Sequence, residues 1–272
     1  MNAEPVSQDR QPPQVLRSAV RSLGLLGPYY RFIEWRGAMA YPKPPALADD
    51  GKALPSRLAM MRIIGVSDWR TYYNQGLATA RMLVETARAV GAEPSRWTAV
   101  LDWGCGCGRI ARHMPALTPA RIHGRDIDAY TVRWSARHLD GDFRVCGLKP
   151  PLDFPPASID FAYGLSVLTH LSAPMQAVWF EELGRMLKPG ALAALSYHDL
   201  DHPSAQGVAF RKTEDGVFLT EWAMEGSNLV AAFQDLASIE RAAAPWFDLV
   251  RHVPREDTGF DQALAVLRRK QT

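Results

Sequence analysis

The stretch Val100-Leu-Asp-Trp-Gly-Cys-Gly-Cys-Gly-Arg109 decides the fold of this 272-residue chain. It is a short apolar run that leads directly into three alternating glycines, Gly104, Gly106 and Gly108, and then into a helical segment. Glycine allows a tight turn and lets backbone N–H groups approach a ligand without an intervening Cβ atom. The stretch therefore predicts a strand-turn-helix unit whose turn contacts a ligand.

The next predicted strand, residues 121–126, ends in the carboxylate of Asp126. It lies about twenty residues beyond the glycines, where an acid can accept hydrogen bonds from both hydroxyls of an adenosine ribose. Gly106 to Ala111 also fits the G-x-G-x-x-A pattern of nicotinamide and flavin dinucleotide sites. Asp102 argues against a dinucleotide, because a carboxylate at the end of the strand repels a pyrophosphate and attracts a ligand that carries an ammonium group.

Short apolar runs alternate with helical segments from residue 69 onward, which is typical of a parallel sheet with crossover helices. The predicted strands are residues 99–103, 121–126, 143–145, 159–163 and 191–197. The predicted helices are residues 69–90, 110–114, 129–139, 174–187 (closed by Lys188-Pro189-Gly190) and, after an irregular stretch from Asp199, 228–241. Residues 247–253 and 263–268 are joined too closely for a crossover helix and predict an antiparallel hairpin. The expected fold is α/β and doubly wound, with a mostly parallel, seven-stranded, Rossmann-like sheet that ends in this C-terminal hairpin.

The first 68 residues differ from the rest in pattern. Residues 1–12 are polar and predict a tail, and apolar residues at helical spacing over 15–35 predict two short helices separated at Gly27-Pro28. The prolines of residues 41–45 predict an extended connector. We therefore expect an N-terminal tail and helical arm or cap over residues 1–68 and the main domain over residues 69–272.

Composition and charge exclude several classes of function. The 31 basic and 29 acidic residues leave a net charge of +2, which argues against a nucleic-acid partner. Three cysteines without metal-ligand spacing predict neither a metal site nor a disulfide framework.

Residues 1–10 have no apolar core, so we expect no secretory signal and a cytoplasmic protein. Residues 161–180 carry no charge but contain several polar side chains, so we expect no membrane span there. The sequence does not indicate an oligomeric state.

Four motifs in order resemble those of the class I S-adenosylmethionine-dependent methyltransferases. They are the glycine-rich stretch 100–109, Asp126 within Gly124-Arg-Asp-Ile-Asp128, the segment Ile159-Asp-Phe-Ala-Tyr-Gly-Leu-Ser-Val-Leu-Thr-His-Leu171, and Phe180-Glu-Glu-Leu-Gly-Arg-Met-Leu-Lys-Pro-Gly190. The resemblance covers roughly residues 70–270. It implies the fold expected above, S-adenosylmethionine as the cofactor and methyl transfer as the reaction.

The resemblance also implies roles for individual residues. Asp102, Gly104, Cys105 and Gly106 would hold the methionine moiety, Asp126 the ribose and Ile127 the adenine, while Leu165 and Ser166 would lie near the sulfonium and Tyr73 would close over the cofactor. Many relatives place an acid after the third strand to accept the adenine amino group. Phe143-Arg-Val-Cys-Gly147 offers none, so the adenine contact stays open.

Methyl transfer requires the protein to position the acceptor, exclude water and, for an oxygen or nitrogen nucleophile, accept a proton. His170 and His198 follow predicted strands and are the candidate bases, although a structural hydrogen bond would explain His170 equally well. Tyr163-Gly-Leu-Ser166 stands where base and glutamine N-methyltransferases carry Asn/Asp-Pro-Pro-aromatic. This favours a small-molecule acceptor: a metabolite, sugar or lipid-like intermediate methylated on O, N or C. A dinucleotide-dependent oxidoreductase and a noncatalytic protein that binds an adenosyl ligand remain alternatives.

Overall fold

The computed structural model describes residues 25–205, 210–212, 216–220, 226 and 230–271. The predicted tail and most of the first arm helix lie outside these residues. The chain divides into two compact units, residues 1–74 and 75–272, and the boundary falls within helix α4 (Trp69–Ala89). The functional division expected after residue 68 stays a prediction.

The described part of the first unit is helical with a proline-containing connector. Helix α2 (Leu26–Met39) begins beside Gly27-Pro28, where a break was predicted, and continues to Met39 rather than ending at Trp35. Helix α3 (Arg57–Ile64) was not predicted. It has clear end signals, because the Ser56 hydroxyl accepts from the Ala59 N–H and Gly65 closes it at φ 70°. At eight residues, however, it is too short to show a helical period.

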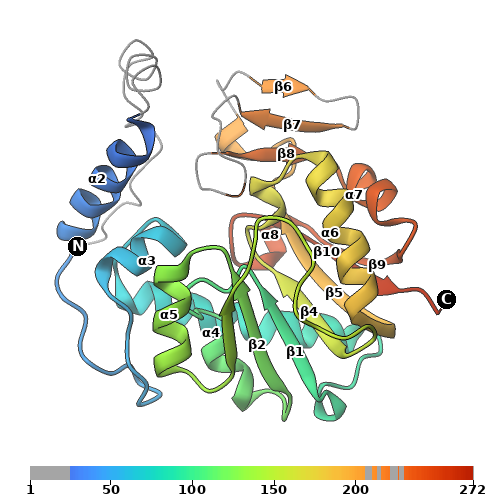
Figure 1. Ribbon diagram of the computed structural model, residues 1–272, viewed down its shortest axis with the longest axis horizontal. Coiled ribbons are helices and arrows are strands. Elements are labelled where there is room, and N and C mark those ends of the chain that lie inside the picture. Colours follow the sequence, from blue (N-terminus) through green and yellow to red (C-terminus); the bar gives the residue numbers. More distant parts are fainter. Residues whose placement is uncertain (1–24, 206–209, 213–215, 221–225, 227–229, 272) are drawn as a thin grey trace. The chain divides into compact units, whose positions relative to one another are not determined.

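The second unit is built on a seven-stranded sheet with the order β3-β2-β1-β4-β5-β10-β9 (Figure 1). Its strands are β1 (Ala99–Trp103), β2 (Arg121–Asp126), β3 (Asp142–Val145), β4 (Ile159–Gly164), β5 (Leu187–Tyr197), β9 (Phe247–Val253) and β10 (Ala263–Arg269). The first five pair in parallel, and β10 is antiparallel to both β5 and β9. The predicted doubly wound fold with a C-terminal hairpin is confirmed.

Helices cover both faces of this sheet, as the alternation along β1 requires. Leu101 lies in a buried cluster with Phe180 of α6 (Ala173–Met186) and Ile239 of α7 (Leu236–Ala243). Its neighbour Val100 lies in the opposite cluster, with Leu83 of α4 and Val132 of α5 (Ala129–His138). Shorter helical segments complete the unit: η2 (Pro94–Arg96), η3 (Ala111–Ala116), η4 (Leu168–His170), η5 (Pro203–Ala205) and α8 (Arg255–Thr258). None of the described helices is long and apolar enough to cross a membrane.

Three local predictions were wrong. The prediction of a helix over residues 228–241 begins outside the described residues, and from Val230 onward the helix is found only from Leu236. Residues Ala232–Gln234 form strand β8 of a small antiparallel sheet with β6 (Phe210–Lys212) and β7 (Val217–Thr220). The helix expected at residues 110–114 is instead the 3₁₀ segment η3, which contains Pro115. Residues 188–190 belong to β5, because the extended backbone of Leu187 (φ −72°, ψ 138°) already ends α6.

Candidate functional site

The glycine loop after β1 is shaped by left-handed backbone. Gly104, Gly106 and Gly108 have φ values of 78°, 49° and 67°. A Cβ atom on Gly104 would lie 2.4 Å from Val167 Cγ2, so a side chain at that position has no room. The N–H groups of Gly104 and Cys105 donate to the Arg125 carbonyl at 2.8 and 3.2 Å. These bonds hold the loop against the end of β2 and leave a cradle that only glycine can line.

Asp126 ends β2 directly beside this loop. Its Oδ2 accepts from the Gly106 N–H and its Oδ1 from the Asp128 N–H, each at 2.8 Å. Burial raises the pKa of Asp126, while these backbone donors favour its charged form. Each carboxylate oxygen has a second lone pair, so the group can still accept from a pair of hydroxyls. The neighbouring Ile127 is 43% exposed, which leaves an apolar surface next to the acid.

Asp102 is a buried carboxyl at the end of β1, paired in the sheet with Gly124 of β2 and Tyr163 of β4. Burial raises its pKa to about 7, with the Asp126 charge adding to the shift and Arg109 opposing it. A cation bound beside Asp102 would therefore lower this pKa and bind more tightly to the ionised form.

The cysteines of this region have structural surroundings. Cys105 is 4% exposed, and its Sγ would lie 2.8 Å from a Cβ atom built on Gly124. Its side chain thus fills the interior against β2, and only its backbone faces the loop. Among the described residues, no three His, Cys, Asp or Glu side chains gather closely enough to hold a metal ion.

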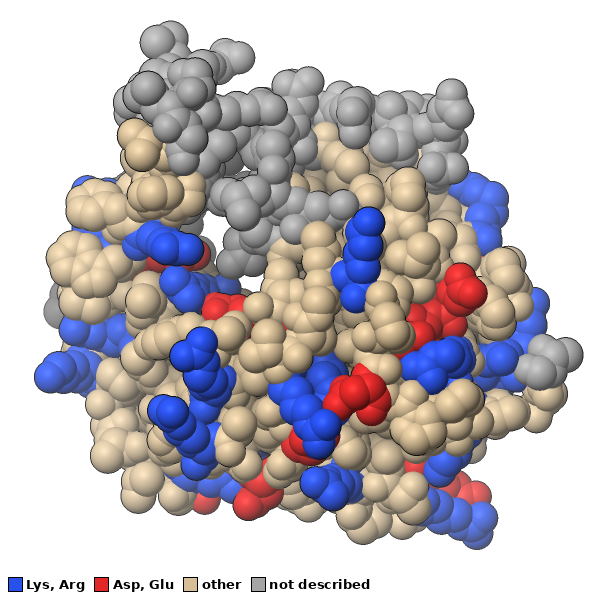
Figure 2. Space-filling view, viewed as in Figure 1, with Lys and Arg blue, Asp and Glu red and all other residues tan. Residues whose placement is uncertain are grey.

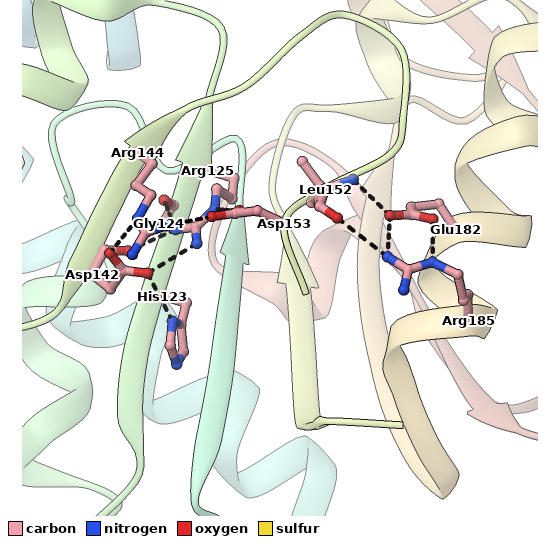
Figure 3. A network of polar contacts seen from close by, with 9 residues as sticks. All are labelled: His123, Gly124, Arg125, Asp142, Arg144, Leu152, Asp153, Glu182 and Arg185. Atoms are coloured by element: carbon pink, nitrogen blue, oxygen red, sulfur yellow. Dashed lines mark hydrogen bonds and ion pairs between the residues drawn. The ribbon is translucent and has the colours of Figure 1, made fainter. Parts of the chain in front are cut away.

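A set of ionisable side chains, which we name the Arg125 network, joins β2 to β3 (Figure 3). Its members are His123, Arg125, Asp142, Arg144 and Asp153. The Arg125 guanidinium is 1% exposed and donates to the carbonyls of Gly124 and Asp142 and to the carboxylates of Asp142 and Asp153, at 2.7 to 2.9 Å. The network ties β2 and β3 to the segment that leads to β4.

Sequence reasoning missed the Arg125 network. Its one local signal is an arginine inside a buried strand, since a buried guanidinium must be paired. Although burial opposes the charge, hydrogen bonds from Arg125 and Arg144 lower the pKa of Asp142 to about 2. The same arginine that anchors this network carries the carbonyl that holds the glycine loop, so one residue couples the loop to the sheet.

Ser166 lies just beyond β4 in a left-handed conformation, φ 58°, which is rare for a residue with a side chain. Its N–H donates to Ser196 Oγ at 2.8 Å, Ser196 Oγ donates to Gln262 Oε1 at 2.5 Å, and Gln262 Nε2 returns to Ser166 Oγ at 2.7 Å. These three hydrogen bonds hold Ser166 in its left-handed conformation. Ser196 and Gln262 were not among the predicted site residues. The adjacent Leu165 is partly buried against the core.

The two candidate histidines differ in their bonding. His170 Nδ1 lies 2.6 Å from the Val230 carbonyl, so this nitrogen donates, and burial lowers the pKa of His170. His198 follows β5 and forms a parallel bridge with Phe233 of β8. Its Nδ1 is buried and has no hydrogen-bond partner among the described residues. Burial, with smaller effects from His202 and His170, lowers the pKa of His198 to about 3, so the ring is neutral at neutral pH.

Tyr73 lies near the start of α4, within the first unit. Its expected contact with the cofactor stays a prediction. The site therefore brings together Asp102, the glycine loop and Asp126 on neighbouring strands, with Leu165, Ser166, His170 and His198 following β4 and β5.

Comparisons with known proteins agree with this geometry. The family described as "Methyltransferase domain" matches residues 100–190. A sterol 24-C-methyltransferase of Yarrowia lipolytica is 27% identical over 189 residues, which cover 62% of this chain and 49% of that protein. Sterol methyltransferase-like 2 of Botryococcus braunii is 33% identical over 123 residues, covering 43% and 31% of the two chains. The chain thus spans about half the length, or less, of these relatives.

Solved structures share the fold. An S-adenosylmethionine-dependent methyltransferase from Methanosarcina mazei superposes with a TM-score of 0.52 at 18% identity, covering 66% of this chain and 95% of that one. One from Mesorhizobium loti gives 0.50 at 17% identity, covering 68% and 96%. The motif positions, the sheet order and the matched domain lead to one assignment. Residues 100–190 match a methyltransferase domain, and the second unit has the fold of S-adenosylmethionine-dependent methyltransferases of known structure.

Proposed function

We propose that this protein transfers the methyl group of S-adenosylmethionine to a small-molecule acceptor. The observation that carries the proposal is the pairing of the glycine cradle with Asp126, whose two oxygens are oriented by the N–H groups of Gly106 and Asp128. A ribose needs such an acid, and an amino-acid moiety needs such a backbone cradle. When bound, S-adenosylmethionine supplies an activated methyl group on a sulfonium.

The residues present fit this cofactor part by part. Asp126 would accept from the ribose hydroxyls, and exposed Ile127 would pack on the adenine. Asp102 would pair with the ammonium group of the methionine moiety beside Gly104, Gly106 and the backbone of Cys105. Leu165 and Ser166 would lie near the reacting end, where the Ser196–Gln262 bonds hold Ser166 still. Tyr73 would close over the cofactor.

The histidines would serve the acceptor side. His198, neutral and with a free Nδ1, would accept a hydrogen bond from an O–H or N–H of the acceptor and orient its lone pair toward the methyl group. His170 would act by holding Gly226 and Val230, since it bonds to the Val230 carbonyl and its own carbonyl accepts from the Gly226 N–H at 2.9 Å.

One feature favours a small-molecule acceptor over nucleic acid, and a second argues against a dinucleotide-dependent oxidoreductase. On the face shown in Figure 2, basic and acidic side chains are interspersed, without the broad basic patch that nucleic acid requires. The antiparallel strand β10 between β5 and β9 takes the place of the second mononucleotide-binding half that an oxidoreductase of the dinucleotide type would need.

Calorimetric titration with S-adenosylmethionine, S-adenosylhomocysteine and NAD tests the cofactor assignment. We expect both adenosyl compounds to bind and NAD not to bind. Asp126→Ala removes two charge-assisted hydrogen bonds and should weaken S-adenosylhomocysteine roughly 100-fold.

The matched control is Asp128→Ala. It removes a carboxylate two residues away whose bond is to the Tyr130 N–H at the start of α5, so it should leave the affinity nearly unchanged. NAD binding alone would refute the assignment. Adenosyl binding without methyl transfer to any acceptor would favour a noncatalytic binding protein.

A further inference from the structure

Buried polar atoms without partners gather where β4 and β5 end. Among the described residues, both side-chain amide atoms of Gln234, the Thr169 hydroxyl and His198 Nδ1 have no hydrogen-bond partner. Gln234 and Thr169 are each 1% exposed. We name Thr169, His198 and Gln234 the β5–β8 edge.

These residues come from segments that meet in the fold. The Gln234 N–H donates to the His198 carbonyl at 3.0 Å, next to the bridge between His198 and Phe233. Thr169 lies in η4, which packs against β8. Ligands of open α/β sheets bind outside the carboxyl ends of the strands. The β5–β8 edge is therefore on the side of the sheet where a methyl acceptor enters.

A buried amide without hydrogen bonds is unfavourable, and native proteins pair almost all such groups. Gln176 of α6 shows the ordinary arrangement. It is also 1% exposed, and its Nε2 donates to the carbonyls of Leu168 and Leu171 at 3.2 and 3.1 Å. Gln234 is equally buried, yet it lacks partners for both its donor and its acceptor. A polar ligand would satisfy both.

We propose that Gln234 binds a polar group of the acceptor, and that the acceptor is a small polar molecule with a hydroxyl or amine nucleophile rather than a sterol. This inference rests on the proposed function and specifies its substrate class. The side-chain carbon that a sterol 24-C-methyltransferase methylates offers nothing to either amide atom, and the ring hydroxyl of a sterol lies at the opposite end of that molecule. The sterol methyltransferases that this chain resembles thus share its domain but differ in the acceptor.

Methyl transfer would form one bond, break one bond and release one proton. The lone pair of the acceptor oxygen or nitrogen forms the new bond to the methyl carbon. The bond between that carbon and sulfur breaks, and its electron pair stays on sulfur. The acceptor proton leaves along the hydrogen bond to His198 Nδ1 and passes to water.

Thermal unfolding of two matched variants tests the state of Gln234 without any ligand. Methionine has a similar length and no hydrogen-bonding amide. Gln176→Met removes two hydrogen bonds: the Leu171 carbonyl loses its side-chain donor, and the Leu168 carbonyl keeps only the Leu171 N–H. This variant should lower Tm by about 5 °C. Gln234→Met removes an amide with nothing to bond and should leave Tm unchanged or raise it by about 2 °C. An equal loss in both variants would overturn the inference, because Gln234 would then be paired within the protein or by a buried water.

Methyl transfer tests the acceptor class. The protein is incubated with S-adenosylmethionine labelled with tritium in its methyl group and a small-molecule extract of yeast cells, which contains both metabolites and sterols. After chloroform extraction, unreacted S-adenosylmethionine is removed from the aqueous phase by chromatography, so that the label counted in either phase is label in product. We expect labelled product in the aqueous phase, reduced at least tenfold in Gln234→Met, while the affinity of that variant for S-adenosylhomocysteine is unchanged.

Label in the chloroform phase, equal in both proteins, would overturn the polar acceptor and leave the methyltransferase proposal intact. Label in neither phase would count against the proposed function itself, and the Tm comparison would still decide the state of Gln234.

Discussion

The Arg125 network and the β5–β8 edge both contain buried polar side chains, but they differ in how their polar atoms are paired. Arg125 bonds to two carboxylates and two carbonyls, and Arg144 bonds to the same two carboxylates (Figure 3). In the β5–β8 edge, described atoms of three residues have no partner. This difference is what the proposal for Gln234 predicts: the protein itself pairs the polar atoms beside the glycine loop, whereas a ligand would pair those of the β5–β8 edge.

The largest expected effect comes from breaking the paired region. Arg125→Met leaves the carboxylates of Asp142 and Asp153 without their buried partner and should reduce the free energy of unfolding by about 3–5 kcal/mol, measured by urea denaturation. Arg144→Met is the matched control, because Arg144 bonds to the same carboxylates but its side chain is 59% exposed. Its loss should stay below about 1 kcal/mol. Equal losses would mean that burial does not set the strength of this network.

Removing the Asp142 carboxylate should cause a smaller loss of stability, and this loss should depend on pH. The pKa of Asp142 is lowered to about 2 in the folded protein, below its model-peptide value of about 3.9. A depressed pKa stabilises the fold above the unfolded pKa, and that stability is lost as pH falls through the folded pKa. Asp142→Asn should therefore destabilise by about 2 kcal/mol at pH 7 and by progressively less from pH 4 to pH 2. A destabilisation that is constant with pH would show that the carboxylate charge contributes nothing.

The elements with a strong local pattern could be predicted from the sequence. Strands β1 and β2 have the predicted bounds, and β9 and β10 form the predicted hairpin, because buried parallel strands and close connections are visible in short windows. The left-handed glycine loop and the position of Asp126 beside it were also predicted, since both depend on residue type at a fixed spacing. Their roles in binding a cofactor stay predictions. Strands β6, β7 and β8 were missed because runs of three or four residues carry no readable period.

The pairing of side chains could not be predicted in the same way. Gln262 bonds to Ser166 across 96 positions of sequence, and Arg125 reaches Asp153 across 28. Nothing local distinguishes Gln176, which is paired, from Gln234, which is not. Which polar group meets which depends on how the strands are ordered, so such contacts appear only once the sheet is assembled.

Asp102 tests the difference between polar groups that the protein pairs and groups that a ligand would pair. Its pKa is raised, whereas that of Asp142 is lowered. Asp142 is already paired with arginines, whereas Asp102 is buried with a pKa of about 7, near Asp126, Tyr163 and Arg109. Protonation below pH 7 removes the charge that would attract the ammonium group of S-adenosylmethionine. The affinity should therefore fall by roughly tenfold per pH unit well below pH 7.

In Asp102→Asn, the affinity for S-adenosylmethionine should be weak and nearly independent of pH between 5 and 8, when measured by calorimetry. The ligand-free variant should also be the more stable protein at pH 8. A raised carboxyl pKa stabilises the fold fully only below about pH 4, and this contribution is lost as pH rises through 7. If the variant keeps the pH dependence of the wild-type protein, another group titrates with binding, and Asp102 belongs with the paired carboxylates of the Arg125 network rather than with the groups that a ligand completes.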